Sequence, residues 1–139
     1  MRKIPSLEIR LMPLIVALML LVSACSVSFS TANVGDAWLA TDKAGQQRTT
    51  TFGQDAVFYA KVDVRNAPED TRVRSVWYVV EAENIEPNFK IEEVTYTVLQ
   101  SGNAMVTFNL SNNMLWPRGR YEVEIYTKRR NQASPHADL

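Results

Sequence analysis

The sequence contains very few of the residues that bind metals or carry out nucleophilic catalysis. It has one cysteine and one histidine among its 139 residues, so an internal disulfide and a zinc site built from several Cys and His side chains are both excluded. The single histidine, His136, lies near the C-terminus, where we do not expect the Ser-His-Asp arrangement of a hydrolase to form. We therefore expect no enzymatic activity, no bound metal and no cofactor.

An excess of charge of one sign is also missing. The sequence has 15 basic and 15 acidic residues, and taking Arg2, Lys3, Arg10 and Glu8 away with an N-terminal leader leaves 12 basic and 14 acidic ones. A chain close to neutrality has no strong field to attract nucleic acid, so we expect no nucleic-acid partner. The short basic run at residues 128–130 is typical of a solvated chain end.

Acidic residues are present but scattered. Glu122 and Glu124 share a face of a predicted strand, and a hydrolase that uses them as a catalytic pair is the weakest of three functional hypotheses. Two exposed glutamates on the solvent side of a strand are the simpler expectation. Asp36 and Asp42 lack the Asp-x-Asp-x-Asp-Gly spacing of a calcium loop, and the sequence has no glycine-rich phosphate loop.

The N-terminus has the pattern of a secretory signal. Three basic residues precede an almost wholly apolar run at residues 11–22, and small residues follow it. A helix needs about 20 apolar residues to cross the hydrocarbon core of a membrane, so this run is short for a permanent span. A charged start, a short apolar run and small residues together predict an exported protein with a helical signal peptide.

Val22, Ser23, Ala24 and Cys25 resemble the lipobox of bacterial lipoproteins. In that family the cysteine thiol receives diacylglycerol, and a signal peptidase then cuts in front of the cysteine. The resemblance implies a signal peptide at residues 1–24 and a membrane anchor through lipid on Cys25. It also implies a place in the bacterial cell envelope, on the outer membrane or the outer face of the cytoplasmic membrane. Two alternatives stay open: an ordinary cleavage site beside an unmodified Cys25, and an uncleaved anchor at residues 11–29.

The rest of the chain predicts one small all-β domain. Residues 25–33 are small and polar enough for a lipid-anchored tether, and residues 128–139 form a polar tail that we expect to be disordered. Between them, residues 34–127 alternate apolar and polar positions and are broken by turn residues. The predicted strands are residues 37–39, 49–52, 56–64, 72–80, 91–99, 104–110 and 121–127. Six or seven short strands at this spacing predict a small antiparallel β-sandwich.

The segment before the last strand resembles the tyrosine corner of fibronectin type III and immunoglobulin-like domains. The match is carried by Leu115, Pro117, Gly119, Tyr121 and Val123. The resemblance implies an immunoglobulin-like sandwich in which the Tyr121 hydroxyl bonds to the backbone of the preceding loop. Such domains continue with one more strand, whereas this chain is polar after Thr127. The final strand is therefore absent, or the topology differs.

Two functional hypotheses remain for the domain. The first is a non-catalytic envelope lipoprotein that contacts another protein or gives structural support. The second is a module that binds a surface polysaccharide or another ligand. The second depends on aromatic side chains predicted to be exposed, namely Tyr59, Trp116 and Tyr126, because exposed aromatic rings stack on sugars or anchor protein partners.

Overall fold

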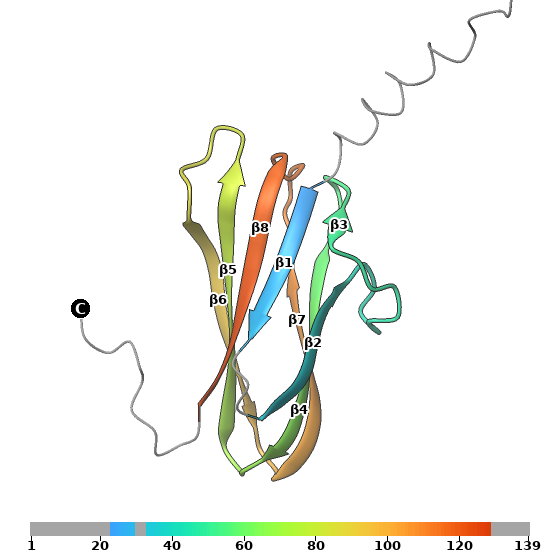
Figure 1. Ribbon diagram of the computed structural model, residues 1–139, viewed down its shortest axis with the longest axis vertical. Coiled ribbons are helices and arrows are strands. Elements are labelled where there is room, and N and C mark those ends of the chain that lie inside the picture. The colour runs from blue at the N-terminus through green and yellow to red at the C-terminus, as the bar shows by residue number, and fades with distance from the viewer. Residues whose placement is uncertain (1–22, 30–32, 129–139) are drawn as a thin grey trace, which may run out of the picture.

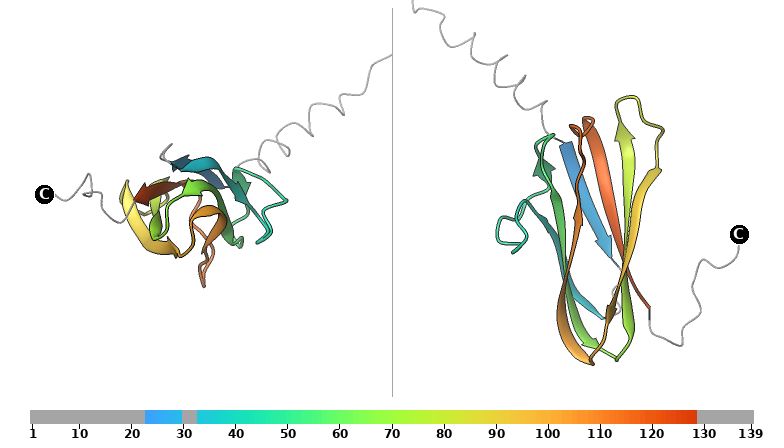
Figure 2. Two further views of the ribbon diagram at one scale, coloured as in Figure 1. Left: turned by 90° about the horizontal axis from the view of Figure 1, so that it is seen from below. Right: turned by 180° about the vertical axis from the view of Figure 1, so that it is seen from behind.

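The computed structural model describes residues 23–29 and 33–128. These residues form eight strands, in two sheets that pack face to face (Figure 1, and end-on in Figure 2). The strands are β1 (Ser23–Phe29), β2 (Val34–Ala40), β3 (Thr51–Phe52), β4 (Phe58–Ala67), β5 (Thr71–Ala82), β6 (Phe89–Val98), β7 (Gly102–Leu110) and β8 (Gly119–Lys128). The predicted all-β sandwich is confirmed. Val22, the expected signal helix and most of the predicted tail lie outside the described residues, and no helix within them is long and apolar enough to cross a membrane.

The two sheets differ in size. The larger has five strands in the order β3-β1-β8-β5-β6, and the smaller has three in the order β2-β4-β7. The pairing of β1 with β8 is parallel, while the other described pairs are antiparallel. Because the smaller sheet has fewer strands, it does not cover the whole inner face of the larger one.

Alternating side chains explain why β4 and β5 form the centres of the two sheets. On β4, the predicted inward positions Phe58, Ala60, Val62 and Val64 are all fully buried. In the middle of β5, at residues 76–80, the side chains on both faces are apolar, as expected for a strand paired on both sides. Trp77 of β5 points into the core, and Val76 is buried on the outer face between β6 and β8.

The core at one end of the sandwich is aromatic. The ring of Phe58 lies 4.7 Å from that of Phe52, 4.9 Å from Trp116, 5.7 Å from Tyr121 and 6.5 Å from Trp77, measured between ring centres. Offset and edge-on ring pairs at these separations add to the free energy of burying apolar surface. This cluster joins both sheets to the loop that precedes β8.

The tyrosine-corner hydrogen bond is present. The Tyr121 hydroxyl donates to the carbonyl oxygen of Pro117, four residues back in the chain. Gly119 is required between them, because a Cβ atom at this position would lie 2.1 Å from the carbonyl oxygen of Glu81 on β5. The spacing of Pro117, Gly119 and Tyr121 therefore reflects a tight backbone approach where β8 begins.

The second edge of β8 is paired with the N-terminal strand of the described residues. β1 occupies the edge of β8 that faces away from β5, and it runs parallel to β8. This corrects the predicted boundaries: residues 25–29 form part of the sheet and are not a free tether, so the domain begins before residue 34. The physical reason is that an unpaired edge of β8 would leave a row of backbone hydrogen-bonding groups without partners.

We expect Tyr121→Phe to lower the free energy of unfolding by about 1–2 kcal/mol, because the Pro117 carbonyl loses its buried donor. Urea denaturation followed by tryptophan fluorescence measures the change. Tyr96→Phe is the matched control, since Tyr96 is 51% exposed and its variant should unfold like the parent protein. Equal unfolding midpoints for the two variants would contradict the role given to the corner.

Candidate functional site

The Cys25 side chain points into the sandwich. It is 3% exposed and belongs to the hydrophobic core. Cys25 pairs with Tyr121 of β8, and its backbone N–H donates to the carbonyl oxygen of Thr50 at 2.8 Å. Of the other predicted recognition residues that are described, Ser23 is buried and Ala24 is exposed on the outer side of the same strand.

Burial makes this thiol unreactive while β1 is in place. Desolvation by burial is the main cause that raises the pKa of Cys25 to about 12; a backbone hydrogen bond with Ser26 opposes the rise, and the negative charge of Glu122 adds a smaller contribution to it. The Cys25 sulfur lies 3.9 Å from the Ser26 carbonyl oxygen. Because the thiolate is the nucleophilic form, a Cys25 docked in the sheet is both shielded and protonated at neutral pH.

The aromatic residues predicted as one binding surface lie in three different places. Tyr59 is on the outer face of the smaller sheet, and Tyr126 is on the outer face of the larger one. The prediction that Trp116 is exposed is wrong: it is 6% exposed and stacks on Phe58. Its indole Nε1–H donates to the Ala56 carbonyl oxygen at 2.8 Å, so the loop before β8 folds inward and closes the aromatic end of the core.

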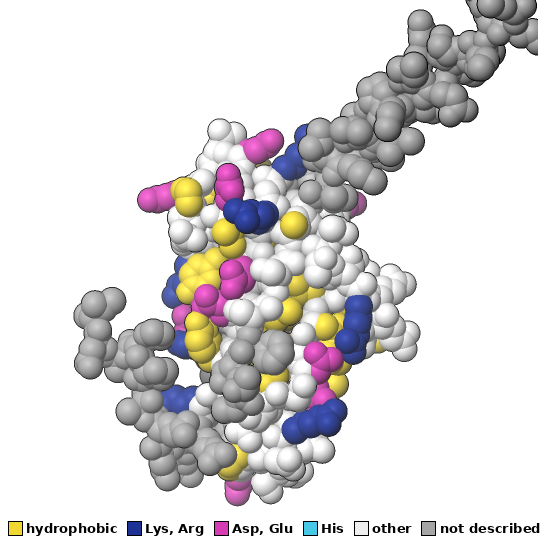
Figure 3. All heavy atoms as spheres, viewed as in Figure 1, with side chains coloured by type: hydrophobic (Ala, Val, Ile, Leu, Met, Phe, Trp, Pro, Cys, Tyr) yellow, Lys and Arg dark blue, Asp and Glu magenta, His cyan; other side chains and the backbone are white. Residues whose placement is uncertain are grey.

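The outer face of the larger sheet carries charged groups that already have partners. The Arg74 guanidinium lies 4.8 Å from the ring centre of Tyr126 and 3.2 Å from a carboxylate oxygen of Glu93. Glu122 and Glu124 share this face, as predicted. Glu124 accepts a hydrogen bond from the Tyr126 hydroxyl, and Glu122 accepts one from Ser28 on β1. Figure 3 shows acidic and hydrophobic side chains lying together over this sheet.

The hydrogen bond to Glu124 has an electrostatic consequence for Tyr126. It is the largest cause that raises the pKa of Tyr126 to about 12, and partial desolvation adds to it. The phenol therefore remains a hydrogen-bond donor over the whole neutral range. The Glu124 carboxylate therefore accepts a hydrogen bond from a phenol. It does not resemble one of the two free carboxylic acids that flank the substrate in a glycoside hydrolase.

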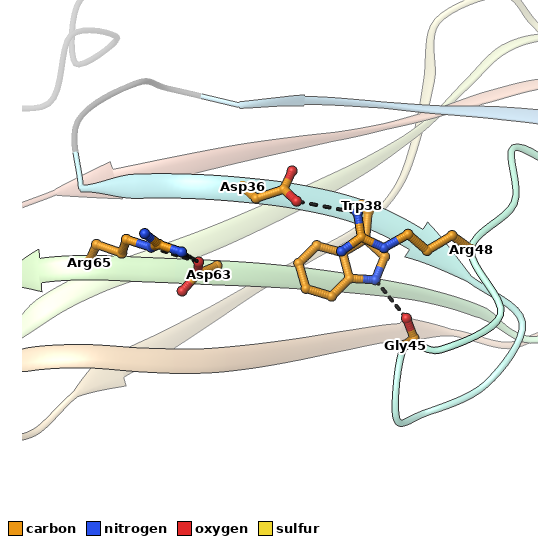
Figure 4. Close-up of polar contacts among 6 residues, drawn as sticks. All are labelled: Asp36, Trp38, Gly45, Arg48, Asp63 and Arg65. Atoms are coloured by element: carbon orange, nitrogen blue, oxygen red, sulfur yellow. Dashed lines mark hydrogen bonds and ion pairs between the residues drawn. The ribbon is translucent and has the colours of Figure 1, made fainter.

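The outer face of the smaller sheet carries a polar cluster that sequence reasoning missed (Figure 4). Asp36 of β2 and Asp63 of β4 are directly opposite each other, an arrangement that destabilises a sheet unless the charges are compensated. Arg48 pairs with Asp36 at 3.3 Å, and Arg65 pairs with Asp63 at 2.7 Å. The two arginines therefore allow two carboxylates to lie side by side on one surface.

Trp38 is at the centre of this cluster. The Arg48 guanidinium lies 3.9 Å from the centre of its ring, and its Nε1–H donates to the Gly45 carbonyl oxygen at 2.9 Å (Figure 4). Both contacts come from the loop at residues 41–48, so the loop and the ring hold each other in place. A cationic group stacked on indole is a favourable contact even at a partly exposed site.

The loop is ordered by a carboxylate and a lysine. Asp42 accepts hydrogen bonds from the backbone N–H groups of Gln46 and Gln47, and the Gln47 bond is the main cause that lowers the pKa of Asp42. Lys61 is almost buried beneath the loop and donates to the Lys43 carbonyl oxygen and the Thr107 hydroxyl. Asp42 thus closes a turn. Among the described residues no group of three or more Asp, Glu, His or Cys side chains is placed to hold a metal.

No protein-family model matches the sequence, and no curated protein matches it. Among solved structures, the chain is similar to the crystal structure of Campylobacter jejuni cj0090, with 8% sequence identity and a TM-score of 0.38. That similarity covers 76% of this chain and 99% of the other. A similarity at this level carries no argument about function, so the function is argued below from this chain's own residues.

We expect the Cys25 thiol of the unprocessed chain to react with a maleimide at pH 8 at least about 100-fold more slowly when folded than in urea, because it is buried and protonated. Folding raises the pKa of Cys25 from 9.0 to about 12. Burial of the neutral thiol therefore contributes fully to the free energy of unfolding below about pH 9, and this contribution is lost as the pH rises. Cys25→Ser should remove the labelling signal. Equal rates with and without urea would contradict the burial of the thiol.

We expect the ultraviolet titration of the folded protein to contain a tyrosine that ionises near pH 12, and Tyr126→Phe to remove that step, because Glu124 holds the phenol proton. Glu124→Gln removes the carboxylate charge, and the step should then move to lower pH. Because burial also raises the pKa of Tyr121, the result that contradicts the assignment is an unchanged number of late-ionising phenols in Tyr126→Phe.

Proposed function

We propose that the protein is a lipid-anchored lipoprotein of the bacterial cell envelope whose β-sandwich contacts another protein and catalyses no reaction. The observation that carries the proposal is the position of Cys25, the only cysteine of the chain, directly after Val22-Ser23-Ala24 at the end of a short apolar run. Lipid on this thiol would attach the domain to the outer membrane or to the outer face of the cytoplasmic membrane. Two or three acyl chains make release from a bilayer very slow, at about 0.8 kcal/mol per buried methylene.

Uncovered apolar side chains on β6 support a role in protein contact. Phe89, Val94 and Tyr96 are 53%, 41% and 51% exposed. They pair with Val79, Ser75 and Val73, which point into the core, so they lie on the inner face of β6 where the smaller sheet does not reach. Apolar surface left open along an edge strand is typical of a site where a second protein packs.

Binding of a surface polysaccharide is the alternative. It was predicted from Tyr59, Trp116 or Tyr126 as exposed aromatic residues; the two tyrosines lie on opposite outer faces, and Trp116 lies in the core. An alternative of this kind would have to use the Trp38 cluster on the smaller sheet. There one face of the indole is already stacked by Arg48, so protein contact remains the favoured function.

An immunoglobulin-like relationship is part of the same proposal. It is supported by the hydrogen bond from Tyr121 to Pro117 and by the close approach at Gly119. The order of the larger sheet departs from that pattern, because the neighbour of β8 is an N-terminal, parallel strand.

We expect the protein extracted from bacterial membranes to begin at Cys25 and to carry the added mass of diacylglycerol, with or without a further acyl chain on its amino group. Intact mass spectrometry measures both features at once. Cys25→Ser should move the protein out of the membrane pellet or leave it unprocessed, whereas the neighbouring control Ser26→Ala should keep the anchor. A polypeptide that begins at Met1 with a free thiol would refute the anchor.

A further inference from the structure

The side chains in the first half of β1 contribute little to its attachment. The inward positions there are Ser23 and Cys25, which are small, and Cys25 lies opposite the large side chain of Tyr121 on β8. The outward positions Ala24 and Ser26 are exposed. Because little apolar area is buried by such residues, backbone pairing provides most of what holds this half of β1 in the sheet.

The first residues of β1 also hold β3. The register joins the two strands through Ser23 opposite Phe52 and Ala24 opposite Thr51, and the Cys25 N–H donates to the Thr50 carbonyl oxygen. Both paired residues of β1 precede Cys25. Cleavage in front of Cys25 would therefore remove both β1 partners of β3.

The buried position of Cys25 leaves no room for a lipid. Cys25 is 3% exposed, and it lies in the core opposite Tyr121. Protein interiors are close-packed and have few voids larger than a water molecule, so a diacylglyceryl group on the sulfur cannot occupy this space. A lipidated Cys25 must lie outside the sheet.

We propose that acylation of Cys25 and docking of the first half of β1 exclude each other, so that maturation opens the edge of β8 at Arg120 and Tyr121 as an acceptor for an extended segment of the partner protein. The proposal rests on the lipidation proposed above. In the unprocessed chain β1 fills this position. The partner's segment should therefore resemble β1: it is extended, parallel to β8, and has small side chains at the inward positions.

A partner protein fits this position better than a second copy of the chain. Each mature copy carries its lipid on the same residue, so the first half of β1 of another copy is subject to the same steric exclusion as its own. A strand from a different protein has no such group. Addition of a strand to an open sheet edge gives affinity through backbone hydrogen bonds and specificity through alternate side chains.

Three forms of the full chain test the proposal. The first is the acylated protein from membranes, in detergent. The second is the unmodified Cys25→Ser chain. The third is the chain alkylated on Cys25 in urea with a bulky maleimide and then refolded. We expect the amide hydrogens of residues 50–52 to exchange at least about tenfold faster in the acylated and alkylated forms than in Cys25→Ser, because β3 has lost its partners.

A peptide measures the opened edge directly. We use a fluorescent, C-terminally amidated peptide with the sequence of residues 20–25 that carries Cys25→Ala, and a control peptide that carries Cys25→Asp instead. The first peptide should bind the acylated and alkylated chains and should not bind Cys25→Ser, where the chain's own β1 fills the position. The control peptide should not bind any form, because it would bury a carboxylate in the core.

The possible results distinguish the two proposals. Slow exchange at residues 50–52 in the alkylated chain overturns the exclusion, whatever the lipidation state in the cell. Fast exchange without peptide binding overturns the acceptor edge. A free thiol on the membrane-extracted protein overturns the lipid anchor and the maturation step, and the alkylated chain then still reports whether a modified Cys25 and a docked β1 can coexist.

Discussion

The backbone pairing of β8 with β5 on one side and β1 on the other holds the larger sheet together. β5 contributes a long antiparallel register with large inward side chains, including Trp77 opposite Val123. β1 contributes a parallel register that begins with small residues. The sheet is thus strongly attached on one side of β8 and weakly on the other, and the weak side contains Cys25. A modification that requires the Cys25 thiol to lie outside the core therefore acts on the more weakly attached strand.

The aromatic end of the core explains how the sandwich can tolerate a weak strand at that place. Phe58 contacts the rings of Phe52, Trp116 and Tyr121, and Trp116 and Tyr121 are attached to the loop before β8 by their own hydrogen bonds. These contacts join β4 to β8 without using a side chain of β1. When β1 loses its pairing with β8 at Cys25, this aromatic cluster stays in place except for Phe52. Phe52 is the exception because its strand, β3, is paired with β1.

Large alternating side chains and one backbone motif made most of the fold predictable. The strand around Phe58 and Val62 was predicted because its apolar residues recur at every second position. A hydrogen bond from Tyr121 to the backbone of the preceding loop was implied by the resemblance to a tyrosine corner, and its acceptor is Pro117. β1 was not predicted, because its first residues, Ser, Ala and Cys, show no alternation in size, and Val27 and Phe29 alone make too short a pattern to indicate a strand. The burial of Trp116 was missed for another reason. A loop residue is buried by the distant residues that the loop packs against, and the local sequence does not indicate which these are.

The polar surfaces were unpredictable for a topological reason. Asp36 and Asp63 are 27 positions apart in the sequence, and only the register of β2 with β4 makes them neighbours. Arg48 reaches Asp36 and Trp38 because the loop that carries it returns over β2. On both outer faces the charges named above, Asp36, Asp63 and Glu93, have arginine partners within the chain. The exposed apolar side chains of β6 and the weakly filled edge of β8 lie toward opposite edges of the same sheet. A partner protein that uses the first meets apolar side chains, and one that uses the second meets backbone hydrogen-bonding groups.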